Sequence, residues 1–155
     1  RCCCDEQTAR LFFANVSSHL KPGGVFVGIL PDSAEIFRAA SKLQIGNSRV
    51  LPPVSGELHR LSFSGDRFSE WGTAYDWMIG DDSSSGFLVN WRKLNELASQ
   101  TGLILLEAVN FRELADEYQQ PFNERFRQQG LSPLQLAQSE IINLHTTFVF
   151  QKTLE

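Results

Sequence analysis

Three cysteines stand side by side at Cys2, Cys3 and Cys4, and they are the only cysteines in the 155-residue sequence. Adjacent cysteines bridge poorly, and they cannot direct three thiolates at one metal ion without distortion. No histidine lies near them and no C-x-x-C spacing occurs, so we interpret them as small apolar residues of a reducing compartment. The sequence therefore predicts neither a metal site nor a redox site.

Serine, histidine and acidic residues are present, but without the spacing of a catalytic triad. The glycine-rich turns that cradle phosphates, G-x-G-x-x-G and G-x-x-x-x-G-K-[ST], do not occur. Gly23 and Gly24 precede an apolar run, whereas a phosphate-binding turn follows a strand and opens a helix. The sequence therefore predicts no catalytic residue of its own and no phosphate cradle.

The composition is that of a globular protein, with 42% apolar and 21% charged residues. Fourteen basic and eighteen acidic residues give a net charge of −4, which argues against a broad basic surface for duplex nucleic acid. The longest apolar run, near "GVFVGIL", is far shorter than the roughly 20 residues that span a bilayer. We also see no signal peptide, so we expect a soluble chain without a membrane partner.

The elements that would position a site begin with helix, strand and helix. Apolar residues spaced by three and four predict an amphipathic helix over 5–20, which "KPGG" ends. The run "VFVGILP" (25–31) predicts a strand buried on both faces of a parallel sheet. Asp32 or Ser33 is then expected to cap a second helix.

The middle of the chain predicts β structure. Turn-forming residues over 45–57 indicate a loop. "LHRLSF" and "RFSEWGTAYDWMI" predict an antiparallel pair, followed by a flexible polar loop, "GDDSSSG". The rest predicts helices over 90–102, 111–130 (broken or kinked at Pro121) and 132–144, and strands over 103–110 and 145–152.

Six segments, in order, resemble the eukaryotic mRNA cap guanine-N7 methyltransferases over nearly the whole chain. They are "NVSSHLKPGGVFVGILPDSAEI", "IGN", "AYDW", "FLVNWRKLNELASQTGL", "VNFRELADEY" and "TTFVFQK". "LKPGG" before an apolar strand is common to many S-adenosylmethionine-dependent methyltransferases. "PDS", "YD", "FLV" and "NF…E…Y" in this order point to the cap enzymes in particular.

The resemblance implies an α/β fold: the second half of a class I S-adenosylmethionine-dependent methyltransferase (Rossmann-like) fold with a β-rich insertion. Residues 1–155 would form a partial methyltransferase domain, and the insertion over 44–86 would be part of the substrate lobe. The last two strands would form an antiparallel hairpin. Most of the S-adenosylmethionine site would lie upstream of Arg1.

The resemblance also implies methyl transfer to guanine N7 of the mRNA 5′ cap. N7 carries a free lone pair and needs no general base, so the protein aligns the base and excludes water. Capped RNA would be the substrate, other capping enzymes would be partners, and the nucleus would be the location.

Carried over residue by residue, the resemblance places Pro31 against the guanine, at the carboxyl end of the strand. Tyr75 lies in the matching "YD" segment as a substrate contact. His145 takes the position of a tyrosine that covers the base in the family. For Pro31 and Tyr75, a simple turn and a core aromatic are the alternatives that stay open.

One position departs from the family pattern. The family usually has a glutamate just before "FLV" that accepts hydrogen bonds from guanine, and here that position is Gly86. Asp81 or Asp82 could supply the acceptor, although solvated loop charges are the alternative. Glu57 is a further acidic candidate.

Two other functions stay open on the sequence. The first is a non-catalytic, methyltransferase-like regulatory subunit of a capping complex, which the loss of the glutamate would suit. The second is a methyltransferase for another small substrate, against which the β-rich insertion argues.

Overall fold

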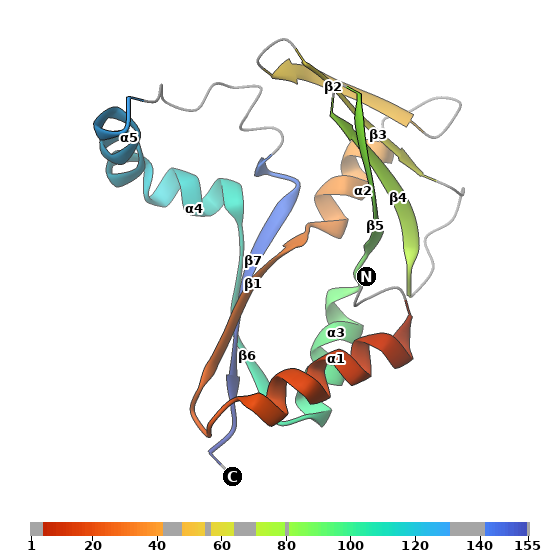
Figure 1. The fold of residues 1–155 in the computed structure, drawn as a ribbon, viewed down its shortest axis with the longest axis vertical. Helices are drawn as coiled ribbons and strands as arrows, with labels where there is room; N and C mark the ends of the chain where they lie inside the picture. The colour runs from red at the N-terminus through yellow and green to blue at the C-terminus, as the bar shows by residue number, and fades with distance from the viewer. Residues whose placement is uncertain are drawn as a thin grey trace.

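The computed structural model describes residues 5–41, 48–54, 57–63, 71–79, 81–130 and 142–154. Two separate β-sheets and the helices around them make up this α/β fold (Figure 1). The three-stranded sheet contains β1 (Val25–Pro31), β6 (Leu103–Asn110) and β7 (His145–Lys152). The four-stranded sheet contains β2 (Ser48–Val54), β3 (Glu57–Phe63), β4 (Thr73–Ile79) and β5 (Asp82–Leu88). The helices are α1 (Glu6–His19), α2 (Ser33–Ser41), α3 (Trp91–Gln100), α4 (Phe111–Glu117) and α5 (Gln119–Gln128).

The strand β7 lies in the middle of the three-stranded sheet and runs antiparallel to both neighbours, β1 and β6. The antiparallel pairing of the last two strands is confirmed. The expectation that β1 is buried on both faces of a parallel sheet is wrong for the described chain. Its hydrogen-bonded neighbour is antiparallel, and its outward residues Val25, Val27 and Ile29 are 53%, 62% and 57% exposed.

The helices α1 and α3 cover the other face of this sheet and form the main core with it (Figure 1). The periodic apolar face predicted for α1 is confirmed, since Ala9 and Phe13 are fully buried in this core. Asp5 caps α1 by accepting a hydrogen bond from the main-chain N–H of Thr8 at 2.7 Å. Asn90 caps α3 in the same way, as predicted.

The four-stranded sheet has the order β2-β3-β4-β5, with every pair antiparallel. The predicted pairing of β3 with β4 is confirmed. The loop predicted over 45–57 is wrong for 48–54, because β2 is an edge strand and takes Pro52 and Pro53 at a register shift. The flexible loop predicted over 80–86 is also wrong from Asp82 onward, because this serine-rich run pairs with β4 as the other edge strand.

The helical run after β6 is interrupted, as predicted, and the interruption falls at Tyr118, between α4 and α5. Pro121 lies in the first turn of α5, where it costs no helical hydrogen bond. The helix predicted over 132–144 lies outside the described residues up to 141, and so do the three cysteines. Within the described part of the chain, no helix is long and apolar enough to cross a membrane.

Candidate functional site

Pro31 and His145 lie directly opposite each other, at the carboxyl end of β1 and the start of β7. The two strands pair in continuous register from Val25 with Gln151 up to this last pair. The sequence expectations for these two residues came from separate segments, and the structure brings both together at one point of the sheet edge. This edge, where β1 and β6 end, is where α/β folds bind their ligands.

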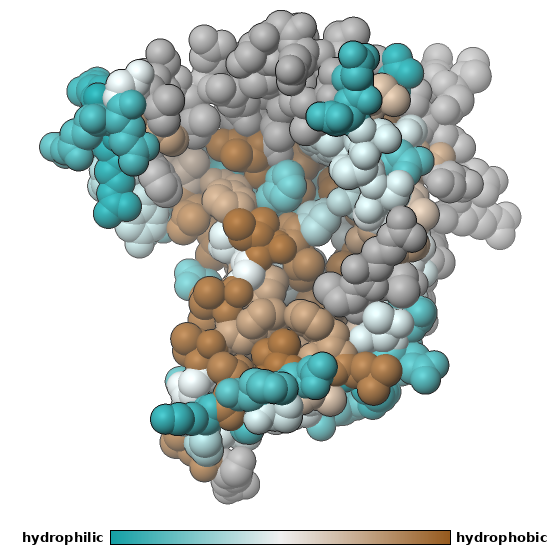
Figure 2. Space-filling view, viewed as in Figure 1, coloured by the Kyte–Doolittle hydropathy of each residue, from teal (hydrophilic) through white to brown (hydrophobic). Residues whose placement is uncertain are grey.

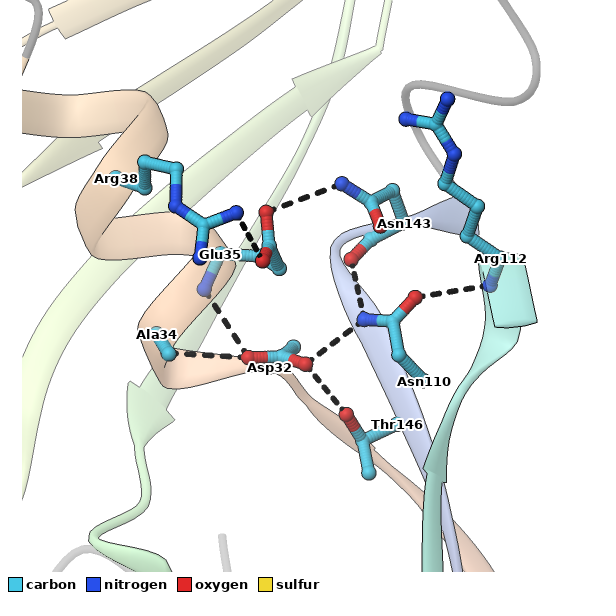
Figure 3. A network of polar contacts seen from close by, with 8 residues as sticks. All are labelled: Asp32, Ala34, Glu35, Arg38, Asn110, Arg112, Asn143 and Thr146. Carbon is cyan, nitrogen blue, oxygen red and sulfur yellow. Dashed lines mark hydrogen bonds and ion pairs between the residues drawn. The ribbon is translucent and has the colours of Figure 1, made fainter. Parts of the chain in front are cut away.

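A network of polar side chains directly follows this pair (Figure 3). One carboxylate oxygen of Asp32, Oδ2, accepts hydrogen bonds from Thr146 Oγ1 at 2.6 Å and from Asn110 Nδ2 at 2.8 Å. The other, Oδ1, accepts from the main-chain N–H groups of Ala34 at 3.1 Å and Glu35 at 3.0 Å. Asp32 therefore caps α2, as predicted, and also joins the ends of β1, β6 and β7.

The pKa of the Asp32 carboxyl lies below its ordinary value of 3.8. Burial is the largest single influence and raises the pKa, but the hydrogen bonds from Thr146, Asn110, Glu35 and Ala34 together lower it by more. The carboxylate is thus charged at neutral pH. All four hydrogen-bond donors to this carboxylate come from the protein itself.

A second layer of contacts supports the network from α2 and from the turn before β7. Asn143 donates from Nδ2 to Glu35 at 3.1 Å, and its main-chain carbonyl accepts from Asn110 at 2.8 Å. Glu35 also forms an ion pair with Arg38 at 2.5 Å. The main-chain N–H of Asp32 donates to the carbonyl of Leu144 at 2.8 Å, so the turn before β7 is tied to β1 by main chain as well as side chains.

Aromatic side chains of the four-stranded sheet reach the same region. The ring of Trp77 lies 6.5 Å from the ring of His145 between centroids, at a tilt of 59°. Trp77 and Tyr75 share one face of β4, and both pack against the second core cluster of Ile36, Leu61, Leu88 and Leu144. Trp77 was not among the residues predicted from the sequence. The alternation in "YDW", which puts its aromatic residues on one face, was the available signal.

Tyr75 lies across β4 and β5 from Gly86, and its ring fills the space where a side chain at Gly86 would begin. A Cβ added to Gly86 would stand 2.7 Å from the Tyr75 Oη and 2.8 Å from Cε1 and Cζ. Burial raises the pKa of the Tyr75 phenol. A neutral hydroxyl therefore occupies the place next to the position where the family pattern has a carboxylate.

Asp81 and Asp82 are both exposed at the far end of the β4–β5 hairpin. Asp82 pairs with Ile79, whereas Gly86 pairs with Tyr75. Four residues along a strand correspond to about 13 Å, so the hairpin does not bring Asp82 to the Gly86 position. The side chain of Glu57 lies outside the described residues.

At this edge the described residues place a proline, an imidazole and an indole next to a network of polar side chains. They hold no group of histidine, cysteine or acidic side chains that could bind a metal ion. In the part of the chain that the structure describes, no glycine-rich turn follows a strand and opens a helix.

The fold is that of a known class of enzyme. The CcbJ methyltransferase from Streptomyces caelestis matches with a TM-score of 0.56 at 13% sequence identity, covering 98% of this chain and 53% of that chain. An S-adenosylmethionine-dependent methyltransferase from Clostridium acetobutylicum matches with a TM-score of 0.50, also at 13% identity, over 96% of this chain and 52% of that one. The chain thus has the fold of part of a class I S-adenosylmethionine-dependent methyltransferase.

Within that class, residues 2–153 match the family described as the mRNA (guanine-N(7))-methyltransferase domain, and the chain belongs to this family. It is 30% identical over 162 residues to mRNA cap guanine-N(7) methyltransferase 2 of Oryza sativa, covering 95% of this chain and 48% of the relative. It is 31% identical over 161 residues to methyltransferase 1 of Arabidopsis thaliana, covering 95% of this chain and 43% of the relative. The chain spans about half the length of these relatives.

Proposed function

We propose that the protein containing this chain methylates guanine N7 of the mRNA 5′ cap, with S-adenosylmethionine as methyl donor. The observation that carries the proposal is the family match over residues 2–153. The relatives named as cap guanine-N(7) methyltransferases support it. The residues at the strand ends suit it chemically, because this reaction requires placement of a base and not acid–base catalysis.

In this proposal, Pro31 and His145 both contact the guanine. Tyr75 and Trp77 on β4 lie next to them and line the side of the base site that the four-stranded sheet forms. Imidazole and indole rings stack on a purine and exclude water from it. The N7 lone pair forms the new bond to the methyl carbon, so no proton has to be removed from the base. The residues of this chain then act by orienting the base and holding it away from water.

S-adenosylmethionine, when bound, supplies an electrophilic sulfonium methyl group. Its site is proposed to lie upstream of Arg1, because the described residues contain no cradle for it and the relatives are about twice as long as this chain. The open face of the three-stranded sheet supports this division. The exposed Val25, Val27, Ile29, Ile104 and Leu106 form an apolar surface of the kind that a further part of the same domain would cover.

Capped RNA is the proposed partner, and other capping enzymes and a nuclear location are proposed with it on the strength of the family alone. The insertion over 44–86 is proposed to be part of the substrate lobe, since its strand β4 carries Tyr75 and Trp77. Asp81 and Asp82 are proposed at most as contacts to parts of the RNA beyond the base. Their exposed position at the hairpin end suits that role better than reading the guanine.

The experiment uses the full-length protein that contains these residues, labelled S-adenosylmethionine, and RNA with an unmethylated GpppG cap. The same RNA with an inosine cap is the matched control, because inosine lacks only the N2 amine of guanine. Methyl transfer to GpppG supports the proposal. Selective transfer to guanine would show that another group has replaced the missing glutamate, and equal transfer to both caps would show that the base edge is not read.

Folded protein that transfers no methyl group to either cap would contradict the proposal and favour a non-catalytic partner of a capping complex. Circular dichroism and cooperative unfolding establish that the preparation is folded. A His145→Ala variant distinguishes an effect on the cap from an effect on S-adenosylmethionine binding. It should lose transfer to the cap while the affinity for S-adenosylmethionine stays unchanged, because His145 is proposed to touch only the base.

A further inference from the structure

Asp32 makes more hydrogen bonds at the edge of the sheet than the capping of α2 requires. A capping side chain needs one acceptor oxygen for the first N–H groups of its helix. In Asp32 the Oδ1 atom does this for α2, while Oδ2 faces the opposite way and accepts from Thr146 and Asn110 (Figure 3). The second oxygen therefore serves strands that are 78 and 114 residues away in sequence.

The residues that flank this contact are the two candidate base contacts. Pro31 immediately precedes Asp32, and His145 immediately precedes Thr146. The Pro31–His145 pair is the last of the β1–β7 register, and strand ends are where main-chain pairing is most easily lost. The bond of 2.6 Å between Thr146 Oγ1 and Asp32 Oδ2 joins the residue that follows Pro31 to the residue that pairs with Leu30, and so spans this last pair.

We propose that Asp32 is a positioning residue for the methyl-transfer site: through Thr146 and Asn110 it fixes the relative position of Pro31 and His145. This rests on the proposed function, and it deepens it by naming a residue that acts on the base contacts without touching the base. Asp32 fixes Pro31 by direct linkage and His145 through the buried hydroxyl of Thr146. Asn110, at the end of β6, donates to the same carboxylate oxygen and so ties the third strand to Asp32.

Several charged groups surround Asp32, and each has another partner or direction. Glu35 on α2 is paired with Arg38 and receives Asn143. Arg112 at the start of α4 donates its main-chain N–H to Asn110 Oδ1 at 2.8 Å, and Figure 3 shows its guanidinium pointing away from Asp32. The ring of His145 lies against Trp77. Among the residues that the structure describes, the hydrogen-bond donors Thr146 and Asn110 hold the Oδ2 atom, and no ion pair does so.

Thr146→Val tests the proposal in the full-length protein, because it removes the hydroxyl donor and leaves the cap of α2 intact. Valine has the shape of threonine, so the buried site stays filled. Thr146→Ser restores the hydroxyl and should restore the function. The matched control is Asp5→Ala, which removes the aspartate cap of α1 at an exposed position outside the site.

The first readout is kinetic. Thr146→Val should lower kcat for GpppG-capped RNA about 10- to 100-fold, because a misplaced base loses the in-line geometry, while the affinity for S-adenosylmethionine stays unchanged. Thr146→Ser should return kcat close to the wild-type value. Asp5→Ala should leave kcat unchanged even though the helix loses its cap.

The second readout does not depend on activity. The nuclear Overhauser contact between the His145 ring and the Trp77 indole should weaken or vanish in Thr146→Val and persist in Thr146→Ser and Asp5→Ala. An unchanged contact together with an unchanged kcat in Thr146→Val would overturn the proposal. If the wild-type protein transfers no methyl group, the proposed function fails, and the ring contact alone then decides whether Asp32 fixes these residues.

Discussion

At Gly86, the space that a side chain would occupy is filled by the ring of Tyr75. The Tyr75 ring covers its Cα from the adjacent strand, so the position holds neither a carboxylate nor a cavity. A side chain can return to this position only if the ring moves. A substitution at Gly86 therefore also changes the position of the Tyr75 ring.

We expect Gly86→Ala to lower the free energy of unfolding by about 1–3 kcal/mol, because the added Cβ crowds the Tyr75 ring. This exceeds the roughly 0.5–1 kcal/mol that alanine normally gains over glycine inside a strand. Chemical denaturation measures the change. Ser84→Ala is the control on the same face of the same strand, at an exposed position, and it should stay within about 0.5 kcal/mol of the wild type. A stabilised Gly86→Ala variant would contradict the packing of Tyr75 over Gly86.

The carboxyl of Asp32 makes stability depend on pH. Its folded pKa is lowered, so its contribution is fully present above the ordinary value of 3.8 and is lost as pH falls through the folded pKa. Asparagine keeps one acceptor oxygen but turns an amide N–H₂ toward the other pair of donors, so Asp32→Asn should cost about 1–2 kcal/mol at pH 7 and progressively less below pH 4. Urea denaturation at several pH values measures this difference. A difference that grows toward acid pH would contradict the assignment.

The sequence could predict Pro31, Tyr75 and His145 only through the family resemblance, and it could predict Asp32 as a local cap. It could not predict that Asp32 also accepts from Asn110 and Thr146, since nothing local connects residues so far apart in the chain. Such contacts depend on the register of β1 with β7, which a single sequence does not specify.

At the scale of single elements, the end of α1 is stabilised from a distant strand. Lys152 at the end of β7 donates from Nζ to the main-chain carbonyls of Ser17 at 2.7 Å and Leu20 at 3.0 Å. The carbonyl of Ser17 also accepts the main-chain N–H of the C-cap residue Leu20 at 3.2 Å, and the carbonyl of Leu20 lies just past the last helical residue. A cation at this end also suits the helix dipole. One side chain thus both caps α1 and anchors the end of the central strand.

We expect Lys152→Met to lower the free energy of unfolding by about 1–2 kcal/mol, since it leaves the two carbonyls without this donor and keeps the aliphatic stem. Thermal or chemical denaturation measures the loss. Lys93→Met is the control, because the ion pair of Lys93 with Glu96 is long, at 3.8 Å, and lies on the surface of α3. Equal effects of the two substitutions would contradict the role assigned to Lys152.

Periodicity predicted the helices α1 and α3, each of which buries an apolar face. It failed for β2 and β5 because their sequences are rich in proline and serine, and edge strands tolerate both. It also failed for the surroundings of β1, because a continuous apolar run does not reveal which of its faces this chain covers. These errors all concern which strands pair, in the local hairpins of β2 with β3 and β4 with β5 and in the distant pairing of β1 with β7.

At the scale of the whole molecule, one face of the three-stranded sheet is apolar and open. Brown, hydrophobic residues gather over this region in the space-filling view (Figure 2). Monomeric soluble proteins rarely expose large continuous apolar surfaces. The 155-residue chain should therefore bind a hydrophobic dye and self-associate in solution.

Val27→Lys probes this face in two proteins. In the 155-residue chain it should reduce dye binding and change the free energy of unfolding by less than about 0.5 kcal/mol, because Val27 is 62% exposed. In the full-length protein it should cost about 3–5 kcal/mol, because the proposed remainder of the domain would bury the charge. Denaturation of both proteins measures the contrast. An equally small cost in both would contradict the proposal that this face is covered.

The central place of β7 has a consequence for the order in which the protein is made. In the described sheet, β1 and β6 form no hydrogen bonds with each other, because β7 lies between them. They can therefore become part of one sheet only when residues 145–152 are present. At about 5–20 residues per second, the ribosome needs roughly 6 to 23 seconds to add the residues that separate Asp32 from Thr146. During that interval Pro31 and Asp32 have been made but His145 and Thr146 have not. A polypeptide that ends before residue 145 would therefore lack the second half of the site.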